Sequence, residues 1–139
     1  MKIEEAEEKG LLRRMEPSQE YSGKEWSEAL SDLGKARLRL RQKDFKWSII
    51  ASYYSMFHAA KALLFLRGIK EKSHYGVQVV LEEWSKRGLL DEKLVADFKA
   101  AMFAREDADY HYEHPQERAA YLAERAEKFI EALGKLKGQ

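Results

Sequence analysis

The segment FAREDADYHYEHP, residues 103–115, crowds an arginine, two histidines, two tyrosines and several acids just before a proline. A guanidinium can hold a phosphate, and an imidazole can move a proton near neutral pH. RNA cleavage without a metal needs both, because a proton must leave the ribose 2′-hydroxyl while negative charge builds at phosphorus. Arg105 and His111 are therefore the candidate catalytic pair.

Helical spacing determines what these side chains can reach. Arg105 and Asp109 are four residues apart, so we expect them to share a helix face and form an ion pair that orients the guanidinium. Tyr112 lies on that face if the helix continues, and His111 lies about a third of a turn away, within reach of a long arginine. The supporting or nucleotide-binding candidates are Asp109, Tyr110 and Tyr112.

The same segment also fits plainer interpretations. An arginine and a histidine separated by five residues occur together by chance in many proteins, and a polar helix end has a similar composition. His111 and His114, with Asp109 and Glu113, resemble a metal-ligand set, but no further fixed ligands accompany them, so we expect no metal. The chain has no Gly-rich phosphate loop, and no cofactor is expected.

Composition narrows the classes of function. A chain of 139 residues fits one domain, and its 25 basic and 24 acidic residues nearly cancel. An electrostatic partner must therefore meet a local patch, because no whole-molecule field attracts nucleic acid or a membrane. The absence of Cys excludes disulfides and thiolate sites. Asn and Thr are also missing while Lys, Arg and Glu are abundant, a composition typical of proteins from organisms that grow at high temperature.

Two stretches bear on location. The N-terminal MKIEEAEEKGLLRR is charged throughout and lacks the apolar core of a signal peptide, so we expect a cytoplasmic protein. The apolar WSIIASYYSMFHAAKALLFL is long enough to suggest a membrane span, but His58, Lys61 and three serines interrupt it. We therefore expect the central helix of a bundle and no membrane contact. His58 is expected to be a hydrogen-bonded core residue.

Residue usage predicts an all-α fold, because helix-favouring residues dominate while Thr is absent and Val is sparse. Turn signals divide the chain into an N-terminal short helix with a loop, residues 1–22, and a helical bundle domain, residues 23–139. We expect a bundle of four or five helices. The expected helices are a short one at 3–14, longer ones at 24–42 and 45–66, and others that begin near Ser73, Asp91 and Pro115.

The helix expected at 24–42 combines an apolar face with a basic end. Ser22 or Gly23 is the expected cap. A period of 3.6 residues assigns five side chains to the core: Trp26, Leu30, Leu33, Leu38 and Leu40. The second half, KARLRLRQK, contains five cations and no acid. It is either a solvated face or a patch for the RNA backbone, with the candidates Lys35, Arg37, Arg39 and Arg41.

Four stretches together resemble the HEPN domain family, above all its small stand-alone archaeal and bacterial members. They read SIIASYYSMFHAAKALLFLRG, SHYGV, GLLD and AREDADYHY, and the similarity runs from about Trp26 to Leu133. The resemblance implies an up-and-down helical bundle that forms a homodimer. It also implies a metal-independent ribonuclease whose motif is an arginine, four to six residues and a histidine, matched here by Arg105 and His111. In such dimers the motifs of the two chains face each other.

Stand-alone members of that family are often toxins encoded beside a minimal nucleotidyltransferase, which acts as the antitoxin. The resemblance implies such a partner for this chain. Some of these partners transfer AMP to a tyrosine two residues after the motif histidine. That position is Glu113 here, and the tyrosines Tyr110 and Tyr112 flank His111 instead.

Three functional hypotheses follow. The first is a dimeric RNA-cleaving toxin in which Arg105 contacts phosphate, His111 moves the proton and Asp109 orients the arginine. The second is a non-catalytic module that binds a nucleotide or docks a nucleotidyltransferase, and it would tolerate loss of the histidine. The third is a purely structural dimer, because the aromatic central helix has more bulky surface than one small bundle buries.

Overall fold

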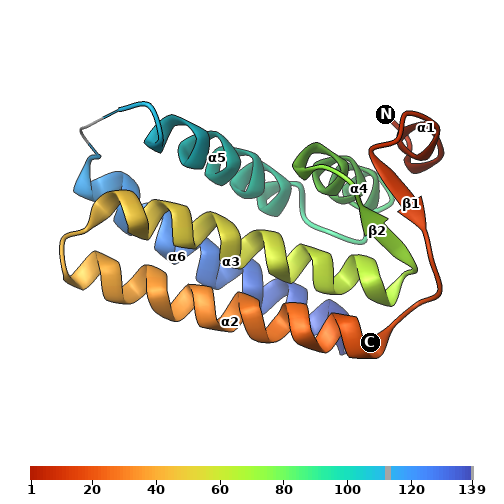
Figure 1. Ribbon diagram of the computed structural model, residues 1–139, viewed down its shortest axis with the longest axis horizontal. Helices are drawn as coiled ribbons and strands as arrows, with labels where there is room; N and C mark the ends of the chain where they lie inside the picture. Colours follow the sequence, from red (N-terminus) through yellow and green to blue (C-terminus); the bar gives the residue numbers. More distant parts are fainter. Residues whose placement is uncertain (112–113, 139) are drawn as a thin grey trace.

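The computed structural model describes residues 1–111 and 114–138 and shows an elongated bundle of helices (Figure 1). Four long helices form its body: α2 (Gln19–Arg41), α3 (Phe45–Leu66), α5 (Glu92–Ala108) and α6 (Gln116–Lys137). At one end lie the shorter helices α1 (Ile3–Glu8) and α4 (His74–Lys86) with the strands β1 (Leu12–Arg14) and β2 (Ile69–Glu71). The prediction of an all-α fold is confirmed, since this two-stranded sheet is the only one in the described part of the chain.

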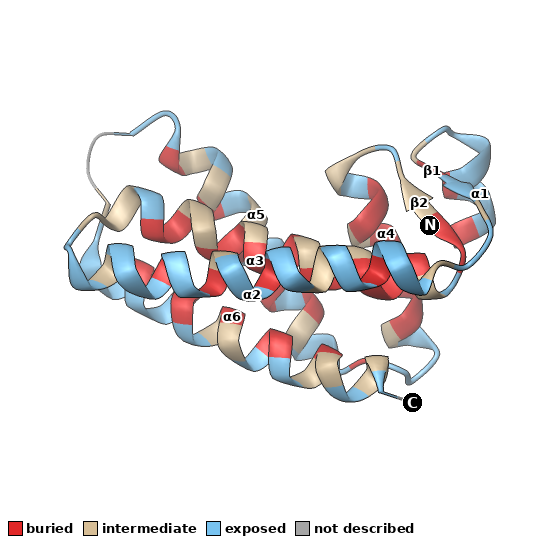
Figure 2. Ribbon diagram, turned by 60° about the horizontal axis from the view of Figure 1, so that its bottom comes forward, coloured by how far each residue is buried: buried red, intermediate tan, exposed pale blue. Residues whose placement is uncertain are grey.

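Helix α3 is the centre of the bundle. It packs against α2, α4, α5 and α6, and buried positions dominate it (Figure 2). By length and composition it could cross a membrane, but 67% of its most apolar 18-residue stretch is buried inside the protein. This burial confirms the predicted core helix. The buried rings of Tyr53, Phe98 and Phe129 come from three helices and meet in one core.

Local signals set most helix starts as predicted. The Ser73 hydroxyl accepts a hydrogen bond from the Gly76 N–H (2.9 Å) and caps α4. The Asp91 carboxylate accepts one from the Lys93 N–H (2.9 Å) and caps α5. Pro115 stands directly before α6. The buried face of α6 contains Ala119, Leu122, Ala126, Phe129, Ile130 and Leu133.

Helix α2 begins earlier than predicted. Its first residue is Gln19 rather than Lys24, because the cap is Ser18, whose hydroxyl accepts a hydrogen bond from the Tyr21 N–H (3.0 Å). Ser22, one of the two predicted caps, is buried inside the helix. The actual cap, Ser18, thus lies four residues before Ser22, the serine from which the helix start was predicted.

The predicted apolar face of α2 is wrong at two positions. Leu30 and Leu38 are 50% and 42% exposed. Small residues replace them at the contact with α3, because Ala29 and Ala36 are fully buried and allow the two backbones to approach closely. The Ser48 hydroxyl of α3 even donates a hydrogen bond to the Ala36 carbonyl (2.8 Å). A prediction that counts only large apolar residues does not detect a buried helix face made of alanines.

The N-terminal segment differs from the predicted helix at 3–14. Helix α1 ends at Glu8, Gly10 turns the chain with a φ of 75°, and the next residues form β1, which pairs antiparallel with β2. Leu12 of β1 and Ile69 of β2 are both buried. This contact joins segments far apart in the sequence, so it overrides the local helix propensity.

Gly76 shows how tightly this segment is seated on α4. A Cβ atom at Gly76 would lie 2.2 Å from the backbone oxygen of Leu11. We therefore expect Gly76→Ala to push the N-terminal segment off α4 and to destabilise the fold by about 1–3 kcal/mol. The free energy of unfolding in urea measures this loss.

Gly23→Ala is the matched control, because a Cβ at Gly23 in α2 meets nothing within 4 Å. It should leave stability unchanged or raise it by up to about 1 kcal/mol through better helix propensity. Equal stability of the two variants would show that the close approach of Gly76 to Leu11 does not exist in solution.

Candidate functional site

Arg105 lies in the last turn of α5, and the packing of the buried side of that helix determines where the arginine side chain points. Phe98 and Ala104 face the core, and Arg105 extends over two rings of α3. Its guanidinium carbon lies 5.2 Å from the ring centroid of Tyr53 and 5.9 Å from that of Tyr54, within cation–π range. The side chain is only 21% exposed. Its Nε–H is buried and has no hydrogen-bond partner among the described residues.

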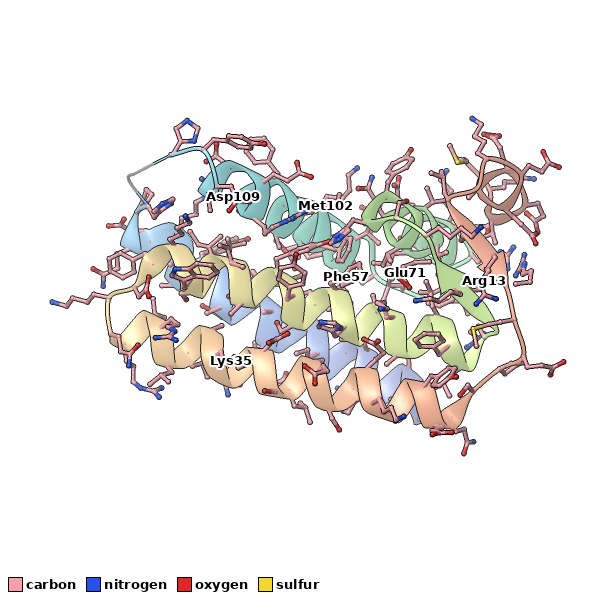
Figure 3. All side chains as sticks on the ribbon, viewed as in Figure 1. Arg13, Lys35, Phe57, Glu71, Met102 and Asp109 are labelled. Atoms are coloured by element: carbon pink, nitrogen blue, oxygen red, sulfur yellow. The ribbon has the colours of Figure 1, made fainter. Side chains whose placement is uncertain are left out.

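Asp109 does not orient Arg105, which corrects the prediction of an ion pair between them. Within the described residues, the ion pair of Arg105 is with Glu106, whose carboxylate lies 3.8 Å from Nη2. Asp109 follows the last residue of α5 and is exposed at the helix end (Figure 3). Arg105 leans toward α3 and so turns away from that end. Tyr110 is 83% exposed, and Tyr112 lies outside the described residues.

His111 lies just beyond α5 and is held by an aspartate. Its Nδ1–H donates a hydrogen bond to the Asp107 backbone carbonyl (3.1 Å), and one oxygen of the Asp107 carboxylate lies 2.9 Å from the same nitrogen. The other carboxylate oxygen accepts a hydrogen bond from Arg118 of α6 (2.9 Å). The His111 side chain is 63% exposed. Along the described ranges 1–111 and 114–138 no contact joins it to Arg105. The structure therefore separates the candidate pair within one chain, with the arginine packed on α3 and the histidine facing solvent.

His74 is a functional candidate that the sequence patterns did not reveal. The buried Tyr53 hydroxyl and Nδ1 of His74 share a hydrogen bond. The imidazole stacks on Phe57 with ring centroids 4.4 Å apart. We call the rings of Tyr53, Tyr54 and Phe57 the aromatic floor of α3. Arg105 and His74, from α5 and α4, both lie on this floor.

Burial, and then the nearby Arg105 guanidinium, lowers the pKa of His74, so the imidazole is neutral at pH 7. In the unfolded chain His74 takes up a proton around the ordinary histidine pKa of 6.5. Between that value and the lower folded pKa the unfolded state holds more protons. Stability should therefore fall as the pH falls below about 6.5 and then level off once folded His74 is also protonated.

The variant His74→Gln should lack this part of the pH dependence. Urea unfolding of both proteins at pH values between about 5 and 8 measures it as a difference in slope. Parallel stability curves for wild type and His74→Gln would show that His74 titrates alike in the folded and unfolded chain.

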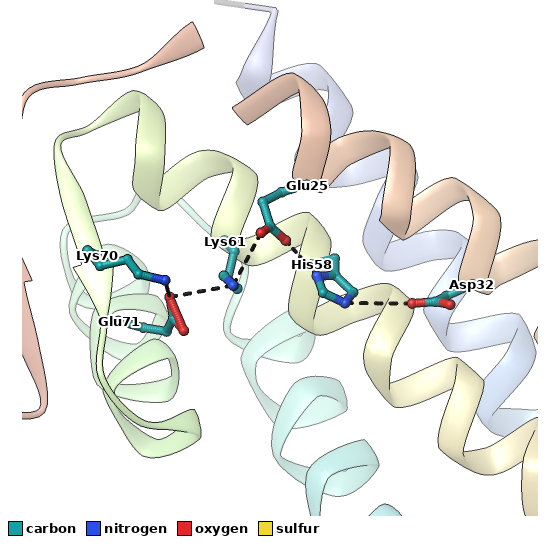
Figure 4. Close-up of polar contacts among 6 residues, drawn as sticks. All are labelled: Glu25, Asp32, His58, Lys61, Lys70 and Glu71. Carbon is teal, nitrogen blue, oxygen red and sulfur yellow. Dashed lines mark hydrogen bonds and ion pairs between the residues drawn. The ribbon is translucent and has the colours of Figure 1, made fainter. Parts of the chain in front are cut away.

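A second polar cluster joins α2, α3 and β2 (Figure 4). The Nδ1–H of His58 donates a hydrogen bond to Glu25 (2.5 Å), and Nε2 lies 3.8 Å from Asp32. Lys61 bridges Glu25 (3.2 Å) and Glu71 (3.6 Å). His58 is thus hydrogen-bonded, as predicted, but it is half-buried at the seam between two helices rather than in the core.

This cluster links α2, α3 and β2 through polar contacts. Burial alone raises the pKa of Glu25, but the His58 hydrogen bond and the Lys61 ammonium outweigh it and lower the pKa, so Glu25 stays ionised. Burial raises the pKa of Asp32. Among the residues that the structure describes, no group of His and acids could hold a metal ion. The cluster therefore ties three elements together by ion pairing.

The four candidate RNA-backbone residues of α2 do not form one surface: Lys35, Arg37, Arg39 and Arg41. Arg37 turns toward α6 and pairs with Glu127 (2.5 Å). Lys35 and Arg39 line a groove of about 510 Å³ between α2 and α3. Arg41 is the exposed last residue of α2. Only one pair of the predicted patch therefore shares a surface.

The α2–α3 groove adds aromatic side chains to these two cations. Trp47 is 53% exposed, and Tyr54 lines the groove while also lying beneath Arg105. Asp32 and Asp44 line the same groove and offset its positive charge. An exposed indole beside cations suits the stacking of a nucleobase. The groove thus leads from Lys35 and Arg39 along α3 toward Arg105.

Comparisons with known proteins match this architecture. Residues 24–136 match the HEPN domain family. The chain is 52% identical over 46 residues to "UPF0332 protein PH1297" of Pyrococcus horikoshii, covering 33% of this chain and 32% of that protein. It is 34% identical over 89 residues to "Putative toxin MJ0142" of Methanocaldococcus jannaschii, covering 62% and 60%. It is 28% identical over 109 residues to "Putative toxin MJ0605" of the same organism, covering 77% and 81%.

The fold defines a class of all-α bundle proteins, here with a cationic and aromatic cluster where α3, α4 and α5 meet. The chain belongs to the HEPN domain family, because the match covers most of its length. The alignments span about a third and three fifths of the first two relatives and most of the third.

Proposed function

We propose that this chain is a metal-independent ribonuclease of the toxin–antitoxin kind that works as a homodimer in the cytoplasm. Arg105 would bind the phosphate and stabilise its extra charge. The observation that carries the proposal is the state of this arginine. It is held over two rings, and its buried Nε–H lacks a hydrogen-bond partner among the described residues. A buried donor without a protein partner can bond to a water or to a bound anion, and the positive charge of the guanidinium favours the anion.

His111 is the proposed proton-transfer residue. Asp107 accepts the Nδ1–H, which fixes the tautomer and leaves Nε2 to take a proton from the ribose 2′-hydroxyl or supply one to the leaving oxygen. Its exposure makes it accessible to a large substrate. The aspartate is in turn held by Arg118 of α6, so the imidazole is tethered to two helices.

A dimer is part of the proposal because Arg105 and His111 do not meet within one chain. We infer that the site combines Arg105 of one copy with His111 of the other. Exposed aromatic side chains beside the motif offer apolar surface for such a contact: Phe103 is 63% exposed and Tyr110 is 83% exposed. The symmetric arrangement then contains two equivalent sites.

The partner proposed for this dimer is a minimal nucleotidyltransferase antitoxin. The two relatives named as toxins support this role for a HEPN chain. Glu113 occupies the position that would hold a modified tyrosine. We therefore propose Tyr110 as the acceptor of AMP, because it adjoins His111 and is 83% exposed.

Incubation of RNA with purified protein in EDTA tests the proposal. Wild type should cleave RNA, while Arg105→Ala should lose about 100-fold or more of the rate. His111→Ala should lose about 100-fold to 10,000-fold, because proton transfer is removed. Arg87→Ala, which removes an exposed arginine just after the end of α4, is the matched control and should cleave like wild type. Equal cleavage by all four proteins would assign the activity to a contaminant and overturn the proposal.

A second candidate is a non-catalytic module that binds a nucleotide or docks a nucleotidyltransferase. The separation of His111 from Arg105 within one chain is the observation that favours it. Such a module should bind a nucleotidyltransferase equally well with His111→Ala and should leave RNA intact. Loss of partner binding in His111→Ala would contradict this role.

A further inference from the structure

Arg105 of α5 and His74 of α4 approach the same two rings of α3. The Arg105 guanidinium lies 5.2 Å from the centroid of Tyr53 and 5.9 Å from that of Tyr54. The His74 imidazole lies 5.6 Å and 6.2 Å from the same centroids. Both groups therefore contact the same two rings, and the guanidinium is near enough to His74 to help lower the pKa of the imidazole. Three helices thus bring a cation and an imidazole together.

The hydrogen bond to Tyr53 fixes which nitrogen of His74 carries the proton. Tyr53 is fully buried, and its hydroxyl has His74 Nδ1 as its hydrogen-bond partner. A hydroxyl that only accepted from Nδ1–H would bury its own hydrogen unpaired, which is costly. The hydroxyl therefore donates, and a neutral His74 carries its hydrogen on Nε2. Burial raises the pKa of Tyr53, so the phenol remains a donor.

The described charged residues around Arg105 and His74 do not give the guanidinium a strong ion pair. Lys61 lies 5.4 Å from the Phe57 ring on which His74 stacks, and its ammonium is already shared with Glu25 and Glu71. Among the described residues, the carboxylate paired with Arg105 is that of Glu106, at 3.8 Å, and its side chain is 58% exposed. Such a long and exposed ion pair is weak. An incoming anion can therefore displace Glu106 from the guanidinium.

We propose that Arg105 and His74 of one chain hold a phosphate group between them over the aromatic floor of α3, with His74 donating its Nε2–H. Arg105 supplies the charge and a buried Nε–H that lacks a described partner. His74 supplies a neutral donor that keeps its hydrogen across the physiological range. The inference rests on the proposed function for the identity of the anion, which is a phosphate of RNA or of a free nucleotide. His74 is thus a phosphate-binding residue, distinct from the proton-transfer residue His111.

Binding measurements with non-cleavable probes test this inference independently of RNA cleavage. The probes are a short 2′-O-methyl RNA oligonucleotide, AMP and inorganic phosphate. His74→Leu should weaken binding by about 10-fold or more, because it removes a hydrogen bond to a charged group. His74→Gln keeps an amide donor and should retain most of the affinity. Glu106→Gln should strengthen binding a few-fold, because it removes the competing carboxylate.

His114→Gln is the matched control, a histidine substitution outside the cluster that should bind every probe like wild type. Dependence on His74 for the oligonucleotide alone identifies a phosphodiester site, and for AMP alone a nucleotide site. Long-range ¹⁵N NMR of the imidazoles should find the His74 proton on Nε2. Equal binding of all probes by folded His74→Leu and wild type, or a proton on Nδ1, would overturn the inference.

The outcomes also separate this inference from the proposed function. Wild type that cleaves no RNA but binds a probe through His74 would remove the ribonuclease and keep the phosphate site. RNA cleavage that is unaffected by His74→Leu, together with unchanged probe binding, would keep the ribonuclease and remove His74 from it.

Discussion

Mixing two inactive variants, Arg105→Ala and His111→Ala, should restore RNA cleavage. In a mixed dimer, one of the two sites combines the intact Arg105 of one chain with the intact His111 of the other. Random pairing makes about half of the dimers mixed, each with one working site of two, so about a quarter of the wild-type activity should return. Cleavage in EDTA after the two chains are unfolded and refolded together measures this recovery.

The recovery depends on the geometry within a chain, where Arg105 packs on α3 and His111 faces solvent. Each variant refolded alone should stay inactive. A double variant, Arg105→Ala with His111→Ala, should add no activity when mixed with wild type, because every mixed site then lacks one group. No recovery in a preparation shown by mass spectrometry to contain mixed dimers would contradict a site shared between chains.

Phe98→Ala should destabilise the protein strongly. Phe98 is fully buried, and its ring lies 5.7 Å from that of Tyr53 and 6.1 Å from that of Phe129. Removal of the ring opens a cavity between α3, α5 and α6, which costs about 3–5 kcal/mol. The melting temperature should fall by about 10 °C or more. Differential scanning calorimetry measures the change.

Phe103→Ala is the matched control on the same helix. Its ring is 63% exposed, so its removal should change stability by about 0.5 kcal/mol or less. Similar losses in both variants would mean that Phe98 does not occupy the buried position described. Because the Tyr53 ring rests on Phe98, the conservative variant Phe98→Leu should also loosen the surface beneath Arg105.

Most of the fold could be predicted because local signals determine it. Ser73, Asp91 and Pro115 mark helix starts within one or two residues of the sites where the structure places them. The long apolar stretch of α3, with its polar interruptions at His58 and Lys61, indicated the central helix of a bundle. Strand β1 escaped prediction because its partner β2 is distant in sequence. The buried face of α2 was wrong because alanines form it.

The sequence motif could suggest candidate residues for a site, but not the directions of their side chains. The motif identified Arg105, but its spacing pointed to Asp109, four residues along the same helix. The structure turns the guanidinium toward rings of α3, which a pattern within α5 does not contain. His74 escaped because its chemistry depends on Tyr53, a residue of another helix. Tertiary contacts therefore decide which polar residues share a site.

The polar contacts among Glu25, His58, Lys61 and Glu71 should contribute relatively more to stability as the temperature rises. Water hydrates isolated charges less favourably as temperature rises, so the penalty for holding these groups away from solvent shrinks on heating. Apolar contacts gain no such advantage over the same interval. The junction of α2, α3 and β2 therefore keeps more of its strength in hot solution than the purely hydrophobic parts of the molecule.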